Sequence, residues 1–185
     1  MPKTDELEAA YSITTPDEAK ALYRNWATTY DGSFAQNLGY VAPREVARVF
    51  KSVADDNTPI LDVGAGTGLI ADHLGGRTVD ALDISSEMLE MAGAKGTYRN
   101  LFTADVLQTL PMKDGEYGGV ISSGTFTHGH VGPACLPELL RITRSGALFA
   151  CGCIPAVYDG MGFGSTLAIL NAHDQISDLS FHDIP

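Results

Sequence analysis

Short apolar runs alternate with helical segments along most of this chain. The apolar runs occupy residues 59–63, 77–82, 98–102, 117–123 and 146–153. The segments between them, at about 67–75, 86–94 and 133–143, repeat apolar residues at helical spacing. This alternation predicts an α/β fold, with a doubly wound, mostly parallel sheet and helices on both of its faces.

The first 55 residues lack this alternation and are predicted to be helical. Residues 15–18 (TPDE) have the form of a helix start, and a second helix is expected from Pro43 to about Ala54. At the other end, a glycine-rich loop is expected to lead into a helix at 164–173 and a sixth strand at about 176–184. We therefore expect one domain over residues 1–185, with 1–55 as an N-terminal helical cap and 56–185 as the α/β core.

A glycine-rich turn follows the first strand of this core. Residues 62–68 read DVGAGTG, a pattern that lets the backbone approach a ligand closely. A nicotinamide or flavin dinucleotide needs a third small residue where this chain has Leu69, which is too large. No Gly-Lys-Ser/Thr follows, which excludes a phosphate-binding P-loop.

Acidic residues accompany the ends of three of the predicted strands. Asp62 precedes the glycine turn, and Asp83 and Asp105 stand near the ends of the next two apolar runs. Together with Ser122, they are expected at the carboxyl edge of the sheet, where ligands bind in such folds. Because the sulfonium, ammonium and ribose hydroxyls of S-adenosylmethionine suit carboxylates, the pattern favours this cofactor. A dinucleotide and a turn without any ligand are the lesser alternatives.

These residues resemble the class I S-adenosylmethionine-dependent methyltransferases over about residues 40–155. Segments at 23–31 (YRNWATTYD), 39–43 (GYVAP) and 124–131 (GTFTHGHV) resemble more closely the Williams–Beuren syndrome region methyltransferase-like group. The resemblance implies a Rossmann-like sheet of seven strands. Only six strands can be placed before Pro185, so the last strand is expected to be missing, through truncation, a missing tail or a shortened family member.

The resemblance also implies which residues bind the cofactor. Asp62 would lie near the ammonium, Asp83 would accept both ribose hydroxyls, and Asp105 would accept the adenine amino group. The other implied contacts are Trp26, Tyr30, Gly64, Ala65, Gly66, Gly68, Ile84, Met88, Val106 and Ser122. Structural alternatives stay open: Asp62 as a loop cap, Asp83 as a helix cap, Asp105 as a turn former, and Met88, Trp26 and Tyr30 as core residues.

Methyl transfer to a small molecule is the expected reaction, with S-adenosylhomocysteine as the product. Such a transfer needs a general base only when the nucleophile arrives protonated. His130 and His128 are the candidates, because they follow the fourth strand in a loop expected to face the acceptor, although structural roles remain open for both. The alternative function is a protein that binds S-adenosylmethionine without transfer, such as a sensor or a partner subunit.

Composition narrows the range of partners. The net charge is −11 and no basic cluster occurs, which argues against a nucleic-acid acceptor. No apolar run approaches the roughly 20 residues that span a bilayer, and the N-terminus lacks a signal-peptide core, so no membrane partner and a cytoplasmic location are expected. The three cysteines do not have the spacing of a metal site. The oligomeric state cannot be derived from the sequence.

Overall fold

A five-stranded parallel sheet forms the centre of the protein. The computed structural model describes residues 18, 21–22, 40–127, 131–177 and 179–185. The strands are β1 (Ile60–Val63), β2 (Val79–Asp83), β3 (Leu101–Thr103), β4 (Tyr117–Phe126) and β5 (Thr143–Cys153). Their spatial order is β3-β2-β1-β4-β5, and every neighbouring pair is parallel. The predicted doubly wound sheet is thus confirmed, with its switch in strand order between β1 and β4.

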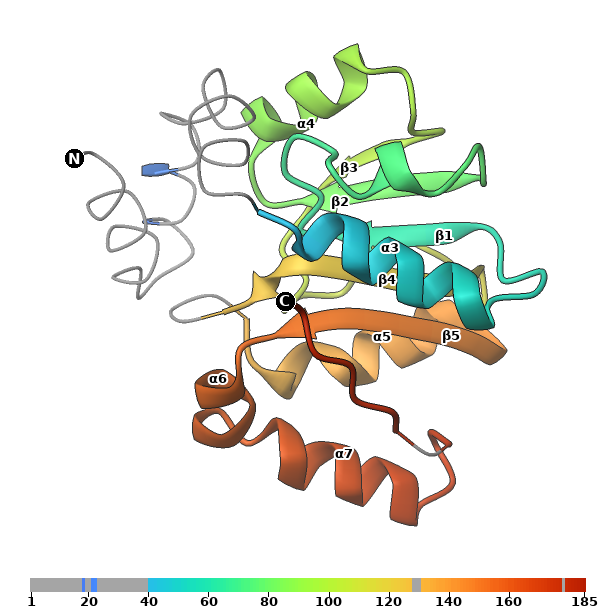
Figure 1. Cartoon of the computed structure of the whole chain (residues 1–185), viewed down its shortest axis with the longest axis vertical. Helices are drawn as coiled ribbons and strands as arrows, with labels where there is room; N and C mark the ends of the chain where they lie inside the picture. Colours follow the sequence, from blue (N-terminus) through green and yellow to red (C-terminus); the bar gives the residue numbers. More distant parts are fainter. Residues whose placement is uncertain (1–17, 19–20, 23–39, 128–130, 178) are drawn as a thin grey trace.

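Helices cover both faces of this sheet (Figure 1). The helix α3 (Ala42–Val53) lies in front of it in this view and α5 (Leu136–Ile142) behind it. Further α-helices within residues 40–127 and 131–177 are α4 (Ser86–Ala94), α6 (Pro155–Gly160) and α7 (Phe163–Ala172), and residues 18, 21 and 22 are also helical. Two short 3-10 helices complete the described elements, η2 (Ala71–His73) and η3 (Pro133–Cys135).

Local sequence explains why α3 forms and where it packs. Pro43 occupies the first turn, where its missing N–H costs nothing, and Val46, Ala47 and Phe50 make one buried stripe. The ring of Phe50 lies so close to β4 that a Cβ on Gly119 would be 2.7 Å from its Cζ. Glycine at this position therefore lets the helix pack directly on the sheet.

The side chains of β1 divide between two apolar clusters. Leu61 and Val63 belong to the cluster that includes residues of α5 and α7, whereas Ile60 packs with residues of α3. Because successive side chains of a strand point to opposite faces, Asp62 lies on the same face as Ile60. This placement puts a carboxylate into the apolar layer beneath the glycine turn.

Three sequence predictions about this fold are wrong. The helix expected at 67–75 is only the three-residue η2, because Gly75 and Gly76, both with positive φ, follow its C-cap Leu74. Residues 155–160, expected as loop, form α6. The strand expected at 176–184 is absent from the described residues there, where side chains make the contacts instead: Ile176 packs on the core and Phe181 on Tyr158.

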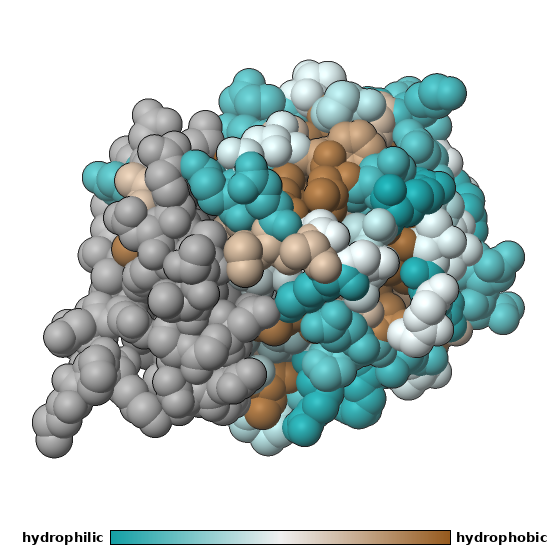
Figure 2. Space-filling model, turned by 90° about the horizontal axis from the view of Figure 1, so that it is seen from above, coloured by the Kyte–Doolittle hydropathy of each residue, from teal (hydrophilic) through white to brown (hydrophobic). Residues whose placement is uncertain are grey.

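Apolar side chains reach the surface in several small groups set between polar ones on the face seen from above (Figure 2). Met91 of α4 and Leu101 of β3 are among the exposed large apolar residues. A mixed surface of this kind is ordinary for a protein face in contact with water. None of the helices in the described ranges has the length and apolar character needed to cross a membrane.

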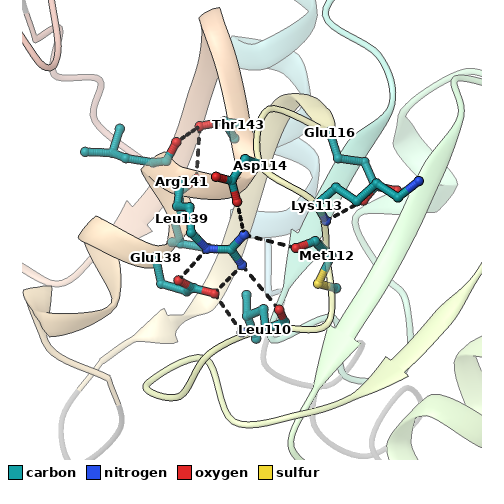
Figure 3. A network of polar contacts seen from close by, with 10 residues as sticks. Leu110, Met112, Lys113, Asp114, Glu116, Glu138, Leu139, Arg141 and Thr143 are labelled. Carbon is teal, nitrogen blue, oxygen red and sulfur yellow. Dashed lines mark hydrogen bonds and ion pairs between the residues drawn. The ribbon is translucent and has the colours of Figure 1, made fainter.

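An ion network ties the β3–β4 connection to α5 (Figure 3). The guanidinium of Arg141 donates to both carboxylate oxygens of Glu138, at 2.9 and 2.6 Å, and to Asp114. It also donates to the carbonyls of Met112 and Leu110, at 3.1 and 3.2 Å, and Glu138 accepts the Leu110 N–H at 2.6 Å. The connection is therefore held by charge-assisted bonds rather than by regular structure.

This network makes stability depend on pH. Hydrogen bonds from Arg141 lower the pKa of Glu138 from 4.5 to about 2. A lowered folded-state pKa adds stability that is present above about pH 4.5 and is lost as the pH falls toward 2. The free energy of unfolding, measured with urea at several pH values, should fall between pH 5 and pH 3. We expect this fall to be smaller in Glu138→Gln than in the wild type. Glu90→Gln, on an exposed position of α4, is the control, and an equal flattening in both variants would contradict the assignment.

Candidate functional site

The predicted polar side chains gather at the carboxyl ends of β1, β2 and β4. The N–H of Gly66 donates to Asp83 Oδ2 at 2.8 Å, which joins the glycine turn to the end of β2. Ser122 Oγ donates to the Val63 carbonyl at 2.8 Å, which joins the same turn to β4. The strand order thus brings these three segments to one edge, at the switch point of the sheet.

The glycine turn has a backbone that only glycine adopts without strain. Gly64, Gly66 and Gly68 have φ values of +66°, +55° and +87°. A Cβ on Gly64 would lie 1.9 Å from Thr125 Oγ1, and one on Gly68 would lie 2.8 Å from the ring of Tyr98. A Cβ on Gly66 would meet no atom of the described residues within 4 Å. The turn is therefore packed at both ends and open in its middle.

Asp83 organises the turn through both of its carboxylate oxygens. Oδ2 accepts the Gly66 N–H and Oδ1 accepts the Ser85 N–H, each at 2.8 Å. Burial raises the pKa of Asp83, and these backbone donors partly oppose the rise. Asp83 is not the N-cap of α4. That role belongs to Ser85, whose Oγ accepts the Met88 N–H at 3.2 Å.

Asp62 is a buried carboxylate with a hydrogen-bond donor on only one of its two oxygens among the described residues. Its side chain is 1% exposed, and Oδ2 accepts the Tyr98 hydroxyl at 2.6 Å. Within the described part of the chain, Oδ1 has no hydrogen-bond partner. Burial raises the pKa of Asp62 to about 7, the Tyr98 hydroxyl lowers it, and the charge of Asp83 raises it further. A buried acceptor without a donor is costly, which points to a donor brought by a ligand.

The residues expected around adenine lie next to this edge. Asp105 Oδ1 accepts the Leu107 N–H at 2.9 Å, so its carboxylate also shapes a turn, as the structural alternative had it. Met88 and Val106 have side chains that are 2% and 6% exposed and pack in the interior. Ile84 is half-buried. Any contact of these four residues with a ligand stays a prediction.

Sequence reasoning missed three residues at this edge. Thr125 donates from Oγ1 to the Val63 carbonyl at 2.8 Å, and Tyr98 binds Asp62. Tyr40 donates to the Ser123 carbonyl at 3.1 Å. Thr125 and Tyr40 belong to segments that the family resemblance had singled out, which was a usable signal. Nothing in the local pattern around Tyr98 indicates its partner.

Four predicted site residues cannot be placed. Trp26, Tyr30, His128 and His130 lie outside the described residues. Their predicted contacts with the cofactor and the acceptor stay predictions. Among the residues that are described, no group of three or more His, Cys, Asp or Glu side chains is arranged to hold a metal ion.

Comparison with known proteins points to one kind of domain. A family described as "Methyltransferase domain" matches residues 61–151, from β1 into β5. No curated protein matches the chain. The fold, however, is shared with many solved structures.

Three of these solved structures show the extent of the likeness. A putative S-adenosyl-L-methionine-dependent methyltransferase from Methanococcus maripaludis has a TM-score of 0.55 at 18% identity, with 84% of this chain and 74% of that one covered. The DhpI–SAH complex has a TM-score of 0.56 at 23% identity, covering 72% and 67%. A putative methyltransferase from Haloferax volcanii, solved with its Trm112 activator, has a TM-score of 0.57 at 20% identity, covering 71% and 58%.

These likenesses establish the fold. The sheet and its flanking helices are those of the Rossmann-like class I methyltransferases. The chain spans between 58% and 74% of the lengths of the first three structures matched. Acceptors and partners of the whole protein therefore do not follow from the comparison.

Proposed function

Because residues 61–151 match a methyltransferase domain family and the chain has the class I methyltransferase fold, we propose that it transfers a methyl group from S-adenosylmethionine to a small-molecule acceptor. The observation that carries the proposal is the pair of carboxylates, the buried Asp62 and the half-buried Asp83, on either side of the glycine turn. The closer likeness to the Williams–Beuren group and a cytoplasmic setting are part of the proposal.

The cofactor fits the chemistry of this edge. S-adenosylmethionine has an ammonium and two ribose hydroxyls, all of which are donors that carboxylates accept. Each oxygen of Asp83 accepts one N–H, which leaves acceptor capacity for ribose hydroxyls, and Asp62 Oδ1 is without a donor among the described residues. The open space above Gly66 leaves room for the cofactor to pass close to the backbone. The two DhpI complexes carry this cofactor or its product in the same fold.

The chain contributes mainly by alignment. Bound S-adenosylmethionine supplies a methyl carbon that the adjacent sulfonium has already activated. Asp62, Asp83 and the turn would hold the cofactor at a fixed depth, so that an acceptor reaches this carbon in line, a contribution worth about 7–11 kcal/mol in well-oriented reactions. His128 or His130 would remove a proton where the acceptor atom carries one.

The negative net charge of the chain favours a small-molecule acceptor over a nucleic acid. The chain carries 23 acidic and 12 basic side chains, which opposes binding of a polyanion. Binding of the cofactor without transfer is the alternative, and no observation on the described residues favours it.

Calorimetric titration of the purified chain tests the cofactor. We expect S-adenosylmethionine and S-adenosylhomocysteine to bind in the micromolar range and NAD to give no binding heat. An acceptor screen that follows S-adenosylhomocysteine release would then test transfer. Binding of NAD with no response to the other two would overturn the proposal.

Asp83→Ala should weaken S-adenosylmethionine binding by about 1.5–3 kcal/mol, the scale of hydrogen bonds to a charged group. Asp83→Asn keeps one acceptor oxygen and should lose less. Calorimetry measures both, with Glu90→Ala as the control, because Glu90 is an exposed carboxylate on α4. Unchanged affinity in Asp83→Ala would refute the ribose assignment.

A further inference from the structure

Tyr98 lies against the last glycine of the turn, although it precedes β3 in the sequence. Its hydroxyl donates to Asp62 Oδ2 at 2.6 Å, across a separation of 36 residues. Its ring packs with the apolar cluster of Ala65, Ala81 and Leu89. A Cβ on Gly68 would lie 2.8 Å from ring carbon Cε2 and 3.3 Å from the hydroxyl. The absence of a side chain at Gly68 is therefore what lets Tyr98 reach the carboxylate.

Because of this contact, the two carboxylate oxygens of Asp62 have different surroundings. Oδ2 is occupied by Tyr98, while Oδ1 is buried and lacks a donor among the described residues. A carboxylate with one oxygen fixed cannot turn freely, so the position of the second oxygen is also set. The ring of Tyr98 is partly buried against Ala65, Ala81 and Leu89, so its packing helps to hold the hydroxyl in place before any ligand binds.

We propose that Tyr98 is a positioning residue that fixes Asp62 Oδ2 and thereby presents Oδ1, in its charged form, to the ammonium end of S-adenosylmethionine, directly or through one water. This inference rests on the proposed function. In this proposal Tyr98 does not touch the cofactor itself. Its role is to favour the charged form of Asp62, which does.

The charged and titratable groups around Asp62 explain why a positioning donor matters. Burial raises the pKa of Asp62 to about 7, and the charge of Asp83 on β2 adds to the rise. Cys151 of β5 also interacts electrostatically with Asp62. Asp72 of η2, paired with Lys95, acts on Tyr98. The hydrogen bond from Tyr98 lowers the pKa of Asp62. The hydroxyl of Tyr98 therefore favours the charged form of Asp62.

Tyr98 itself remains a donor throughout this range. Burial, together with the neighbouring Asp62 charge, raises the pKa of the Tyr98 phenol far above its ordinary value. Because Tyr98 keeps its proton, removing its hydroxyl should move the titration of Asp62 to higher pH.

The first test needs no ligand. Carbon-detected NMR of the full chain, with aspartate carboxyls labelled, follows the titration of Asp62 in the wild type and in Tyr98→Phe. We expect the midpoint to rise by about one pH unit or more, the equivalent of one hydrogen bond to a charged group. Tyr117→Phe is the matched control, since it removes another buried tyrosine–aspartate bond, to Asp80 at 2.8 Å. An unmoved Asp62 midpoint in Tyr98→Phe would overturn the proposal.

The second test compares two ligands that differ at the ammonium end. S-adenosylhomocysteine has the ammonium, whereas 5′-methylthioadenosine lacks the whole amino-acid portion. Between pH 6 and pH 9, wild-type affinity for the first should rise with the Asp62 titration and affinity for the second should stay flat. Tyr98→Phe should weaken S-adenosylhomocysteine binding about tenfold at pH 7, recover at higher pH, and leave 5′-methylthioadenosine unchanged. Equal losses for both ligands at every pH would show a merely structural role and overturn the proposal.

A second variant covers the case of a poorly folded Tyr98→Phe. Asp62→Asn cannot titrate, so its affinity for S-adenosylhomocysteine should be weak and independent of pH; a retained pH profile would overturn the proposal. The same measurements separate a failure of the proposed function from a failure of the role assigned to Tyr98. Wild type that binds neither S-adenosylmethionine nor its product overturns the proposed function and the ligand assigned to Asp62. Normal binding with an unmoved profile in Tyr98→Phe overturns only the role of Tyr98.

Discussion

Replacing Gly64 with alanine should abolish cofactor binding and destabilise the fold. The residue has a φ of +66°, and left-handed backbone costs an L-residue about 1–2 kcal/mol. The new Cβ would also lie 1.9 Å from Thr125 Oγ1, which donates to the Val63 carbonyl. Relieving that clash breaks the bond, at about 1 kcal/mol more. We expect urea unfolding to show a loss of about 2–4 kcal/mol and calorimetry to show no S-adenosylmethionine binding.

Two variants separate strain from contact at Gly64. Gly75→Ala carries the same backbone strain, with a φ of +67°, but its Cβ would meet no atom of the described part of the chain within 4 Å. It should lose about 1–2 kcal/mol and bind the cofactor normally. The double variant Gly64→Ala/Thr125→Ala should regain part of the stability because the clashing hydroxyl is gone. Normal cofactor binding by Gly64→Ala would show that the turn does not approach the ligand.

Replacing Asp80 with alanine should strongly lower the free energy of unfolding without a direct effect on cofactor binding. Asp80 is 0% exposed and accepts five hydrogen bonds: from Arg99 at 2.9 and 2.6 Å, from Asn100 at 3.0 and 3.1 Å, and from Tyr117 at 2.8 Å. Removing the carboxylate leaves the Tyr117 hydroxyl buried without its acceptor and ends the pairing of Arg99. Breaking a fully buried ion pair costs about 3–5 kcal/mol, and the cost here should fall toward the lower end because Arg99 is 44% exposed.

Urea unfolding with matched variants measures this cost. Tyr117→Phe removes one of the five bonds and should lose about 1 kcal/mol. Arg99 is 44% exposed, so Arg99→Met, which leaves the other donors to Asp80 in place, should lose less than Asp80→Ala. A loss of under about 1 kcal/mol in Asp80→Ala would mean that water replaces the carboxylate at this position.

Local pattern predicted the parts of the fold that depend on neighbouring residues in the chain. The helix expected at 86–94 is Ser86–Ala94, because Ser85 caps it and its apolar residues follow helical spacing. The five apolar runs became the five strands, with ends shifted by a few residues. The segments at 67–75 and 176–184 failed for opposite reasons. Two glycines stop the first helix after one turn, and the second segment makes side-chain contacts but pairs with no described strand.

The sequence by itself determined the order of strands and helices, the glycine turn and the acids that follow the strands, because each depends on spacing within a few residues. It also pointed to the class of cofactor, since donors and acceptors are a matter of residue type. Only the tertiary structure decided that Tyr98 holds Asp62, that Thr125 requires glycine at position 64, and that Asp80 is a structural carboxylate rather than a site residue. These contacts join residues far apart in the chain. Periodicity records which face a residue occupies, but the partner on that face is chosen by the packing of the whole sheet.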